Sequence, residues 1–383
     1  MPGKMLKRLC SSLRRRRNWA ACCLLFLLPL LSACTASGEA EDGRLEYAQW
    51  LRMTEGEGYT LCSIMDPWNE GKILQRLVLE EDASPASDSI VGIHIRVPLQ
   101  RAVCGATPHA HLAFRLGSGG RIAGLLDADY AVSDSLRRAI AFGSLRDCGG
   151  AMDPDIERLS ALHPDALLLS PFAGSGYGAL ENCGVPIIAC ADYMETSPLG
   201  RAEWMRLYGR LFGCRAEADS LFAAETARYA RLKSEAEATA AAARPSLLVD
   251  RMQGEAWHVP GAESYLGRLF EDAGFRYVFQ EYRQAGSVAL TLDEVYVLGR
   301  EADCWLLRTT QDLPAAALRR DDPRYGEFRP LQTGNVWQCN TLTTPYYDIL
   351  PFAPSKLLRE LISIARQGQQ AAADSLQYFE RLH

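Results

Sequence analysis

The sequence predicts an α/β protein in which two Rossmann-like lobes are bridged by a single long α-helix. Residues 215–243 contain no Gly or Pro and are rich in Ala, Glu, Arg and Leu, which is typical of one uninterrupted helix. On both sides of this segment, short apolar runs alternate with helical patterns, as they do in parallel sheets that helices cover on both faces. The two sides are of similar length, so each is expected to form a lobe of its own.

The chain divides at positions where a helix cannot continue. Gly213 ends the helical pattern before the long helix, and Pro245 prevents the long helix from continuing. The predicted organisation is a signal peptide at 1–34, a tether and N-terminal strand extension at 35–90, an N-terminal lobe at 91–213, an interlobe helix at 214–244 and a C-terminal lobe at 245–383.

The first segment has the pattern of a secretion signal. Basic residues between Lys4 and Arg17 precede an apolar run at 19–31, which is too short to span a bilayer. The run ends in Leu-Ser-Ala-Cys34, which resembles the lipobox of bacterial lipoproteins and implies that Cys34 is lipidated. We therefore expect an exported protein that a lipid anchors to the cell envelope, on the periplasmic side, with the exterior as the alternative. A single-pass anchor and an ordinary cleaved signal are the alternatives.

Composition narrows the range of partners. The formal net charge is −6, and it becomes −13 without the first 34 residues, so nucleic acid is not an expected partner. Eight cysteines follow Cys34, and none of them forms a Cys-x-x-Cys motif, which disfavours a zinc or redox site. Cys104, Cys190 and Cys304 lie in apolar runs and are expected to be buried thiols. The pairing of any disulfides stays open.

Strand and helix patterns alternate in each lobe. Strand-like segments at 59–65 and 73–79 precede the lobes. In the N-terminal lobe we predict strands at 101–106, 121–126, 166–170 and 186–190, and helices at 110–116, 155–162, 177–183 and 199–212. In the C-terminal lobe we predict strands at 246–250, 276–279 and 303–308, and helices at 264–273 and 291–300. The segments that begin at Asp155 and Asp293 share one helix–strand pattern, which indicates a faint internal duplication.

Several stretches carry a family resemblance: Asp192–Gly213 (DYMETSPLGRAEWMRLYGRLFG), Trp257–Gly261, Ser264–Gly274, Glu157–Asp165 and Ala302–Leu307. Together they resemble the class III substrate-binding proteins of ABC importers, in particular Bacteroidetes-like lipoprotein members that share Y-x-E-x-x-P-L-G-x-A-E-W. The resemblance implies little hinge motion and a ligand held in the cleft between the lobes. It also implies a monomer without a resident cofactor or enzyme activity, which works with ABC permease and ATPase subunits.

The ligands of that family are metal chelates. The expected function is therefore capture of an iron-siderophore or haem, with cobalamin as the alternative. A site for free Zn²⁺ or Mn²⁺ is less well supported, since the chain has six histidines and one close pair among them. An exported metal-binding enzyme is a further alternative, but the sequence lacks Gly-x-Ser-x-Gly, His-Glu-x-x-His and Walker motifs.

Candidate ligand-binding residues follow the predicted strands, because ligands of open α/β sheets bind outside the carboxyl ends of the strands. The candidates are Thr107, His109, His111, Tyr130, Tyr193, Glu195, Arg201, Trp257, His258 and Arg308, and Tyr346 and Tyr347 are weaker candidates.

Several of these residues also have a purely structural interpretation. His109 and His111 could contact a chelated metal or the ligand, or they could be exposed or capping side chains. Glu195 could face the cleft or stabilise the start of the following helix. Trp257 could stack on a flat macrocycle or pack beneath the next turn. Arg308 could meet a carboxylate or phosphate of the ligand.

The resemblance also implies one acidic residue on each lobe that docks on arginines of the permease. The matching positions are Glu157 and Glu294, with Asp293 as an alternative to Glu294. An ordinary solvated helix face is the other interpretation of both positions.

Overall fold

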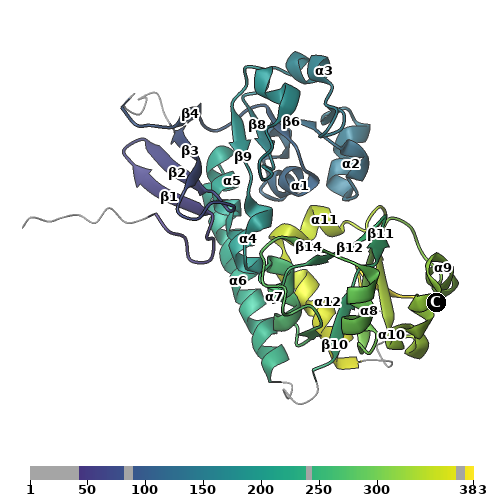
Figure 1. Ribbon diagram of the computed structural model, residues 1–383. Coiled ribbons are helices and arrows are strands. Elements are labelled where there is room, and N and C mark those ends of the chain that lie inside the picture. Colours follow the sequence, from purple (N-terminus) through teal and green to yellow (C-terminus); the bar gives the residue numbers. More distant parts are fainter. Residues whose placement is uncertain (1–42, 82–88, 239–243, 368–375) are drawn as a thin grey trace, which may run out of the picture. The chain divides into compact units, whose positions relative to one another are not determined.

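The computed structural model describes residues 43–81, 89–238, 244–367 and 376–383, which belong to one compact unit. The predicted signal peptide, the lipidation site Cys34 and the tether lie outside the described residues. No helix in this described part is both long and apolar enough to cross a membrane. Two lobes and an additional N-terminal sheet make up the unit (Figure 1).

The N-terminal lobe contains a five-stranded parallel sheet in the order β7-β6-β5-β8-β9. Its strands are β5 (Ala102–Cys104), β6 (Ile122–Leu125), β7 (Arg146–Asp147), β8 (Ala166–Leu169) and β9 (Ile187–Ala189). Its helices are α1 (Thr107–Arg115), α2 (Asp134–Ala141) and α3 (Ile156–Ala161). Strands β5 and β8 are apolar and fully buried, as expected for a parallel sheet covered on both faces. The strands predicted in this lobe are confirmed, while α2 and β7 were not predicted.

Two predicted helices of this lobe differ in the structure. The helix predicted at 177–183 is a short 3-10 segment, η3 (Gly178–Asn182). Gly178 and Gly184 have φ angles of 59° and 69°, and a left-handed backbone at both ends prevents an α-helix from extending. The helix predicted at 199–212 is divided at Trp204 into α4 (Pro198–Glu203) and α5 (Met205–Leu211).

The C-terminal lobe has a five-stranded sheet in the order β13-β10-β15-β16-β17 and a three-stranded sheet in the order β11-β12-β14. The strands are β10 (Ser246–Val249), β11 (Met252–Gln253), β12 (Ala256–Pro260), β13 (Arg276–Tyr277), β14 (Ser287–Leu290), β15 (Cys304–Thr309), β16 (Val336–Asn340) and β17 (Glu380–Arg381). The helices are α7 (Tyr265–Asp272), α8 (Leu292–Gly299), α9 (Ala315–Asp321), α10 (Arg329–Thr333), α11 (Tyr346–Ile349) and α12 (Pro354–Gln367). In the larger sheet β17 runs antiparallel to β16, and the other pairs are parallel.

The two lobes repeat one connection pattern. In the N-terminal lobe, β5 lies between β6 and β8, and α3 precedes β8. In the C-terminal lobe, β10 lies between β13 and β15, and α8 precedes β15. The segments that begin at Asp155 and Asp293 therefore occupy equivalent places, which supports the internal duplication.

Helix α6 (Arg215–Glu237) contributes to the hydrophobic cores of both lobes. It spans 23 residues and is therefore about 35 Å long. Ala218 and Phe222, in its first half, pack in the core of the N-terminal lobe. Tyr229, Leu232 and Ala236, in its second half, pack in the core of the C-terminal lobe. The bridging helix is thus confirmed, and its last predicted residues, 239–243, lie outside the described residues.

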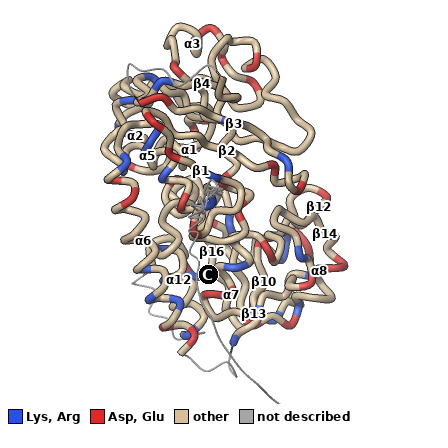
Figure 2. Tube along the Cα trace, turned by 90° about the vertical axis from the view of Figure 1, so that its left-hand side faces the viewer, with Lys and Arg blue, Asp and Glu red and all other residues tan. Residues whose placement is uncertain are grey.

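Helix α12 packs along α6, and α6 carries both acidic and basic residues along its length (Figure 2). A buried carboxylate joins them. Glu225 of α6 is 1% exposed and accepts a hydrogen bond of 2.7 Å from the backbone N–H of Ser355 at the start of α12. Helix α12 is therefore fixed to the middle of α6, where the two cores meet.

A separate four-stranded sheet of order β1-β2-β3-β4 precedes the lobes. Its strands are β1 (Leu51–Gly56), β2 (Tyr59–Met65), β3 (Ile73–Glu80) and β4 (Ile93–Arg96). Its apolar face belongs to the same hydrophobic core as α5. The side-chain amide of Gln75 bonds the backbone of β9, with 2.7 Å to the Ile187 oxygen and 2.9 Å to the Ala189 nitrogen. The sheet thereby covers the edge strand β9, which would otherwise expose unpaired backbone groups.

Two buried glutamates bind residues 46–50, which we call the N-terminal strap. The carboxylate of Glu203 accepts hydrogen bonds of 2.7 and 2.9 Å from the backbone N–H groups of Tyr47 and Ala48. The carboxylate of Glu195 accepts 2.9 and 3.0 Å bonds from those of Gln49 and Trp50. Both glutamates are 0% exposed. The strap is therefore attached to the segment that leads from the N-terminal lobe into α6.

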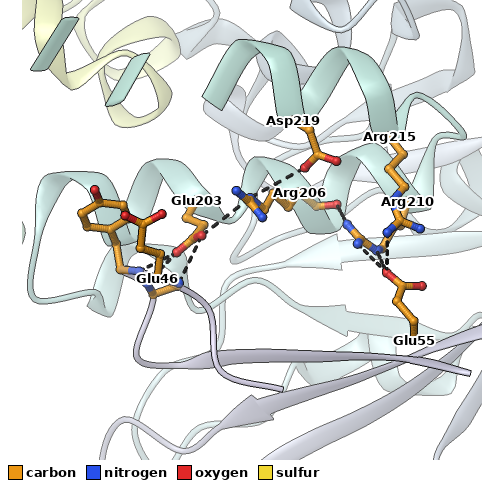
Figure 3. A network of polar contacts seen from close by, with 9 residues as sticks. Glu46, Glu55, Glu203, Arg206, Arg210, Arg215 and Asp219 are labelled. Carbon is orange, nitrogen blue, oxygen red and sulfur yellow. Dashed lines mark hydrogen bonds and ion pairs between the residues drawn. The ribbon is translucent and has the colours of Figure 1, made fainter. Parts of the chain in front are cut away.

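Ion pairs extend this attachment to β1 and α6 (Figure 3). The Nε atom of Arg206 lies 3.6 Å from Glu203 and 3.7 Å from Asp219 of α6. Glu55 of β1 lies 2.6 Å from Arg210 of α5 and 3.0 Å from Arg215 of α6. Glu55 is partly exposed, so the strap glutamates are expected to contribute more to stability than these ion pairs.

Replacing Glu203 should destabilise the protein because the backbone donors of the strap would lose their acceptor. We expect Glu203→Ala to lower the free energy of unfolding by about 3 kcal/mol, measured by urea denaturation. The matched control is Glu57→Ala in the exposed β1–β2 turn, which should change it by less than about 0.5 kcal/mol. Equal effects of the two substitutions would contradict the role assigned to Glu203.

Candidate functional site

A cavity of about 530 Å³ lies where the carboxyl ends of strands from both lobes meet. Gly105 to Pro108 follow β5, and Asp127 follows β6. From the C-terminal lobe, Asp250 follows β10, and the segment Arg308–Thr310 lies at the end of β15. Strands β5 and β10 are the points at which strand order reverses in the two sheets, which is where ligands of open α/β sheets bind. The position and volume of the cavity suit a small-molecule ligand.

Two aspartates at the cavity have an unusual backbone. Asp127 has φ of 52° and Asp250 has φ of 59°, a left-handed conformation that residues other than glycine adopt rarely. Such conformations concentrate at functional sites, where surrounding contacts maintain them. Here each aspartate turns the chain out of a buried strand and into the wall of the cavity.

Asp250 holds Arg308 at the cavity. The Nε atom of Arg308 donates a 2.9 Å hydrogen bond to one carboxylate oxygen, and Nη2 donates to the other. Burial alone would lower the pKa of Arg308, but the adjacent Asp250 carboxylate raises it well above its ordinary value. The guanidinium is therefore permanently charged, and the 24% of its side chain that stays exposed faces the cavity that it lines.

Arg201 of α4 is another arginine that lines the cavity, and it comes from the N-terminal side of the chain. Its Nε atom donates a 3.0 Å hydrogen bond to Asp192, and the other oxygen of Asp192 lies 2.8 Å from Nε2 of His109. Burial would raise the pKa of Asp192, but its contacts with His109 and Arg201 keep that pKa below its ordinary value. The guanidinium of Arg201 also lies 4.6 Å from the ring centre of Tyr265 in α7. Arg201 thus contacts both lobes.

The C-terminal lobe also reaches the N-terminal lobe through α11. Asp348 of α11 is 1% exposed and accepts hydrogen bonds of 2.9 and 2.6 Å from the backbone N–H groups of Val132 and Ser133 at the start of α2. A carboxylate is favoured at a helix N-terminus. This contact fixes the two lobes to each other beside the cavity.

Of the predicted ligand-binding residues, five line the cavity: Thr107, Tyr130, Arg201, His258 and Arg308. The other five make contacts elsewhere in the protein, namely His109, His111, Tyr193, Glu195 and Trp257.

Trp257 is a structural residue rather than a platform for a ligand. Its side chain is 0% exposed, and its ring is stacked on that of Trp305 at 5.9 Å. The Nε1 atom of Trp257 donates to the Val249 carbonyl at 2.8 Å, and that of Trp305 donates to the Asp250 carbonyl at 2.7 Å. Trp257 lies within strand β12 and not in an exposed loop, which corrects the expectation of stacking. Both tryptophans support the backbone that holds Asp250.

Glu195 and Tyr193 also serve the fold. Glu195 binds the strap and accepts a 2.8 Å hydrogen bond from Nε1 of Trp204, so its carboxylate does not face a ligand. The hydroxyl of Tyr193 donates to the carbonyl of Pro171, and its ring lies 5.9 Å from that of Phe172. The expectation that residues 193 and 195 face the cavity is therefore corrected.

The two histidines of α1 do not form a metal-binding pair. They lie two positions apart on the helix and bond different partners, since His109 contacts Asp192 and Nδ1 of His111 lies 3.1 Å from the Ser133 hydroxyl. Within the described residues, no three His, Cys, Asp or Glu side chains are grouped closely enough to hold a metal ion. The eight described cysteines are free thiols.

Several cavity residues were not predicted from the sequence: Asp127, Asp250, Gln253, Ser287, Thr309, Thr310, Thr341 and Leu342. Tyr347, which lines the cavity, was a weaker candidate. Thr341 and Leu342 were missed because the strand before them, β16, was not predicted. That strand contains the polar residues Gln338 and Asn340. These polar side chains are buried and paired, with 2.9 Å bonds to Leu313 and Asp312 respectively. An aspartate directly after a buried strand, such as Asp250, was a signal that could have been used.

The predicted docking residues lie on exposed helix starts. Glu157 is exposed in the first turn of α3. Glu294, in the first turn of α8, accepts 2.7 and 2.8 Å hydrogen bonds from the backbone and hydroxyl of Thr291, which lower its pKa. Asp293 is 87% exposed and lies 2.8 Å from Arg324.

Comparison with known proteins gives a family match. Residues 112–340 match the model of a family described as periplasmic binding protein. A relative with a curated description is an uncharacterized lipoprotein of Methanocaldococcus jannaschii, 21% identical over 271 residues. That alignment covers 65% of this chain and 63% of the relative, which is less than two thirds of the relative's length.

Solved structures share the fold at low sequence identity. A periplasmic heme binding protein from Pseudomonas aeruginosa matches with a TM-score of 0.58 at 16% identity. The match covers 74% of this chain and 98% of that protein's chain. A siderophore binding protein from Vibrio cholerae, solved with Fe³⁺–Desferal, matches with a TM-score of 0.51 at 18% identity. This match covers 70% of this chain and 99% of that protein's chain. Both solved structures therefore share the fold of this chain.

The buried position of His111 generates a pH prediction. Burial, with a smaller contribution from Arg115, lowers the pKa of His111 to about 4, whereas an unfolded histidine titrates near about 6.5. Only the unfolded state takes up this proton as the pH falls from about 6.5 towards 4, so His111 contributes a decrease in the free energy of unfolding over that range.

The measurement compares urea denaturation of the parent protein and His111→Gln between pH 6.5 and pH 5. His111→Gln should lose less stability on acidification than the parent. His258→Gln, at an exposed position, should retain the parent's slope. Parallel pH profiles for the parent and His111→Gln would contradict the prediction.

Proposed function

Because the chain belongs to the family of periplasmic binding proteins, the substrate-binding components of ABC importers, we propose that it captures a ferric siderophore and delivers it to a permease. The observation that carries this proposal is the lining of the cavity, in which each lobe contributes one arginine held by an aspartate. The proposed activity is binding and transport, with no chemical step.

The hydroxyl groups of the cavity favour an oxygen-rich ligand. They belong to Thr107, Tyr130, Ser287, Thr309, Thr310, Thr341 and Tyr347. Hydroxyl and guanidinium groups donate hydrogen bonds to the hydroxamate, catecholate or carboxylate oxygens that surround iron in a siderophore. A cavity of about 530 Å³ is within the ordinary range for a small-molecule site.

The charges at the cavity favour a chelate that is neutral or weakly charged. Arg201 is compensated by Asp192, and Arg308 is compensated by Asp250. A further carboxylate, Asp127, also lines the cavity. The two arginines therefore act mainly as directed hydrogen-bond donors. A strong positive field at the cavity would instead favour a small free oxyanion.

Haem is the second candidate because His258 lies exposed on the cavity wall. A neutral imidazole there could approach the iron of a haem. The tyrosines Tyr130 and Tyr347, which are 59% and 45% exposed, offer ring faces at the same cavity. Cobalamin, the alternative ligand of the resemblance, has no comparable contact in its favour.

We also propose export and lipid attachment at Cys34. The lipobox-like sequence before Cys34 and the lipoprotein description of the archaeal relative support this. The proposed partners are ABC permease and ATPase subunits, with the protein acting as a monomer.

Ligand binding is tested by titrating the purified protein with ferric desferrioxamine, haemin and cyanocobalamin. We expect ferric desferrioxamine to bind, and quenching of tryptophan fluorescence measures its Kd. Arg201→Gln and Arg308→Gln should each raise this Kd about tenfold. Arg231→Gln, on the exposed side of α6, should leave Kd unchanged. Tight binding of haemin alone, with a Soret band that shifts in His258→Ala, would favour the second candidate and overturn the first.

Permease docking is tested separately with Glu157→Gln and Glu294→Gln. Glutamine retains the capping interaction of Glu294 with Thr291 while removing the charge. We propose that the double variant binds the chelate normally but supports little uptake in cells, because the permease loses both acidic contacts. Glu217→Gln, at an exposed position of α6, is the control. Normal uptake by the double variant would remove this assignment.

A further inference from the structure

The two cavity arginines are held by their aspartates in different ways. Arg308 uses two nitrogen atoms, Nε and Nη2, to contact both oxygens of Asp250. Among the hydrogen bonds between described residues, Arg201 donates to Asp192 through Nε alone. The second oxygen of Asp192 is taken by His109 at 2.8 Å. The difference between the two arginines thus coincides with the presence of a histidine.

Among the residues that the structure describes, Asp192 is the polar partner of His109. His109 is 1% exposed, and Asp192 is 0% exposed. The Nδ1 atom of His109 is buried without a hydrogen-bond partner among the described residues. Because a carboxylate can only accept, the Nε2 atom of His109 is the donor in its contact with Asp192.

The surroundings of His109 keep its ring in place. The ring lies 5.5 Å from that of Tyr208 in α5 and 6.2 Å from that of Phe352. These contacts come from both sides of the interlobe junction. Its donor therefore reaches only one carboxylate oxygen, Oδ1 of Asp192.

We infer that His109 and Asp192 are positioning residues that keep the terminal nitrogens of Arg201 available to the ligand. By occupying Oδ1 of Asp192, His109 prevents the two-pronged contact that Asp250 makes with Arg308. Arg201 is then held by Nε on one side and by the Tyr265 ring on the other, and its Nη1 and Nη2 groups are left for the cavity. This inference rests on the proposed function, because it assigns Arg201 to ligand binding.

The first experiment concerns geometry and needs no ligand. In a crystal structure of His109→Leu, we expect Arg201 to rotate and contact both oxygens of Asp192. In His109→Gln, whose side-chain amide can still donate to Oδ1, Arg201 should keep its single contact through Nε. A His109→Leu structure in which Arg201 is unmoved would overturn the inference, whether or not any chelate binds.

The second experiment measures affinity for ferric desferrioxamine. His109→Leu should raise Kd about tenfold, and His109→Gln should stay within about twofold of the parent. In the Arg201→Gln background, His109→Leu should have no additional effect, because its influence passes through Arg201. A loss of similar size in both backgrounds would overturn the inference, since it would indicate a general effect on the fold. Failure of the parent to bind any chelate would overturn the proposed function instead, and the geometric experiment would still decide the role of His109.

Discussion

The structure depends on one helix that belongs to two hydrophobic cores. The apolar side chains of α6 pack in the N-terminal lobe along its first half and in the C-terminal lobe along its second half. Because neither core can move along the helix without exposing apolar surface, the separation of the lobes is set by the helix. The strand ends that form the cavity are thereby held at a fixed distance. A binding site of this kind exists before its ligand arrives, and little binding energy is spent on rearrangement.

One sequence motif serves both the attachment of the N-terminus and the cavity. In the stretch from Asp192 to Trp204, the two glutamates bind the strap, and Trp204 donates to one of them. Arg201, between them in sequence, lines the cavity. Binding the strap and lining the cavity are compatible because Glu203 and Arg201 lie two positions apart in helix α4 and therefore point to different sides of it. The motif is therefore informative about the fold as much as about the ligand.

The fold could be predicted from the sequence because apolar strands and helix-breaking residues are local signals. Strands β5, β8, β10 and β15 are short apolar runs, and the prediction of each was correct. Strand β16 was missed because its buried polar side chains are satisfied by partners far away in sequence, which no local pattern reveals. Helix α2 was missed although local signals were present, namely Ser133 and Asp134 at its start and Gly143 after its end.

The site could be predicted only in part, for a related reason. A position after a strand identifies residues near the cavity, but it does not distinguish side chains that face the cavity from those that face the protein. Trp257 and Glu195 have the chemistry of ligand-binding residues, yet both are fully buried and bond backbone groups. Arg201 and Arg308 have the same chemistry and do line the cavity. The distinction is made by tertiary contacts, such as those of Asp192 and Asp250.

The strap also has a mechanical consequence. A pulling force applied to the N-terminal end of the described residues would load the contacts of Gly43 and Arg44 with β1 and then the backbone of residues 46–50. Several charge-assisted hydrogen bonds would then share the force in shear, and they would have to break together before β1 could be peeled from its sheet. Tension on the chain would consequently be passed to the junction between the lobes, and the strands that form the cavity would be spared.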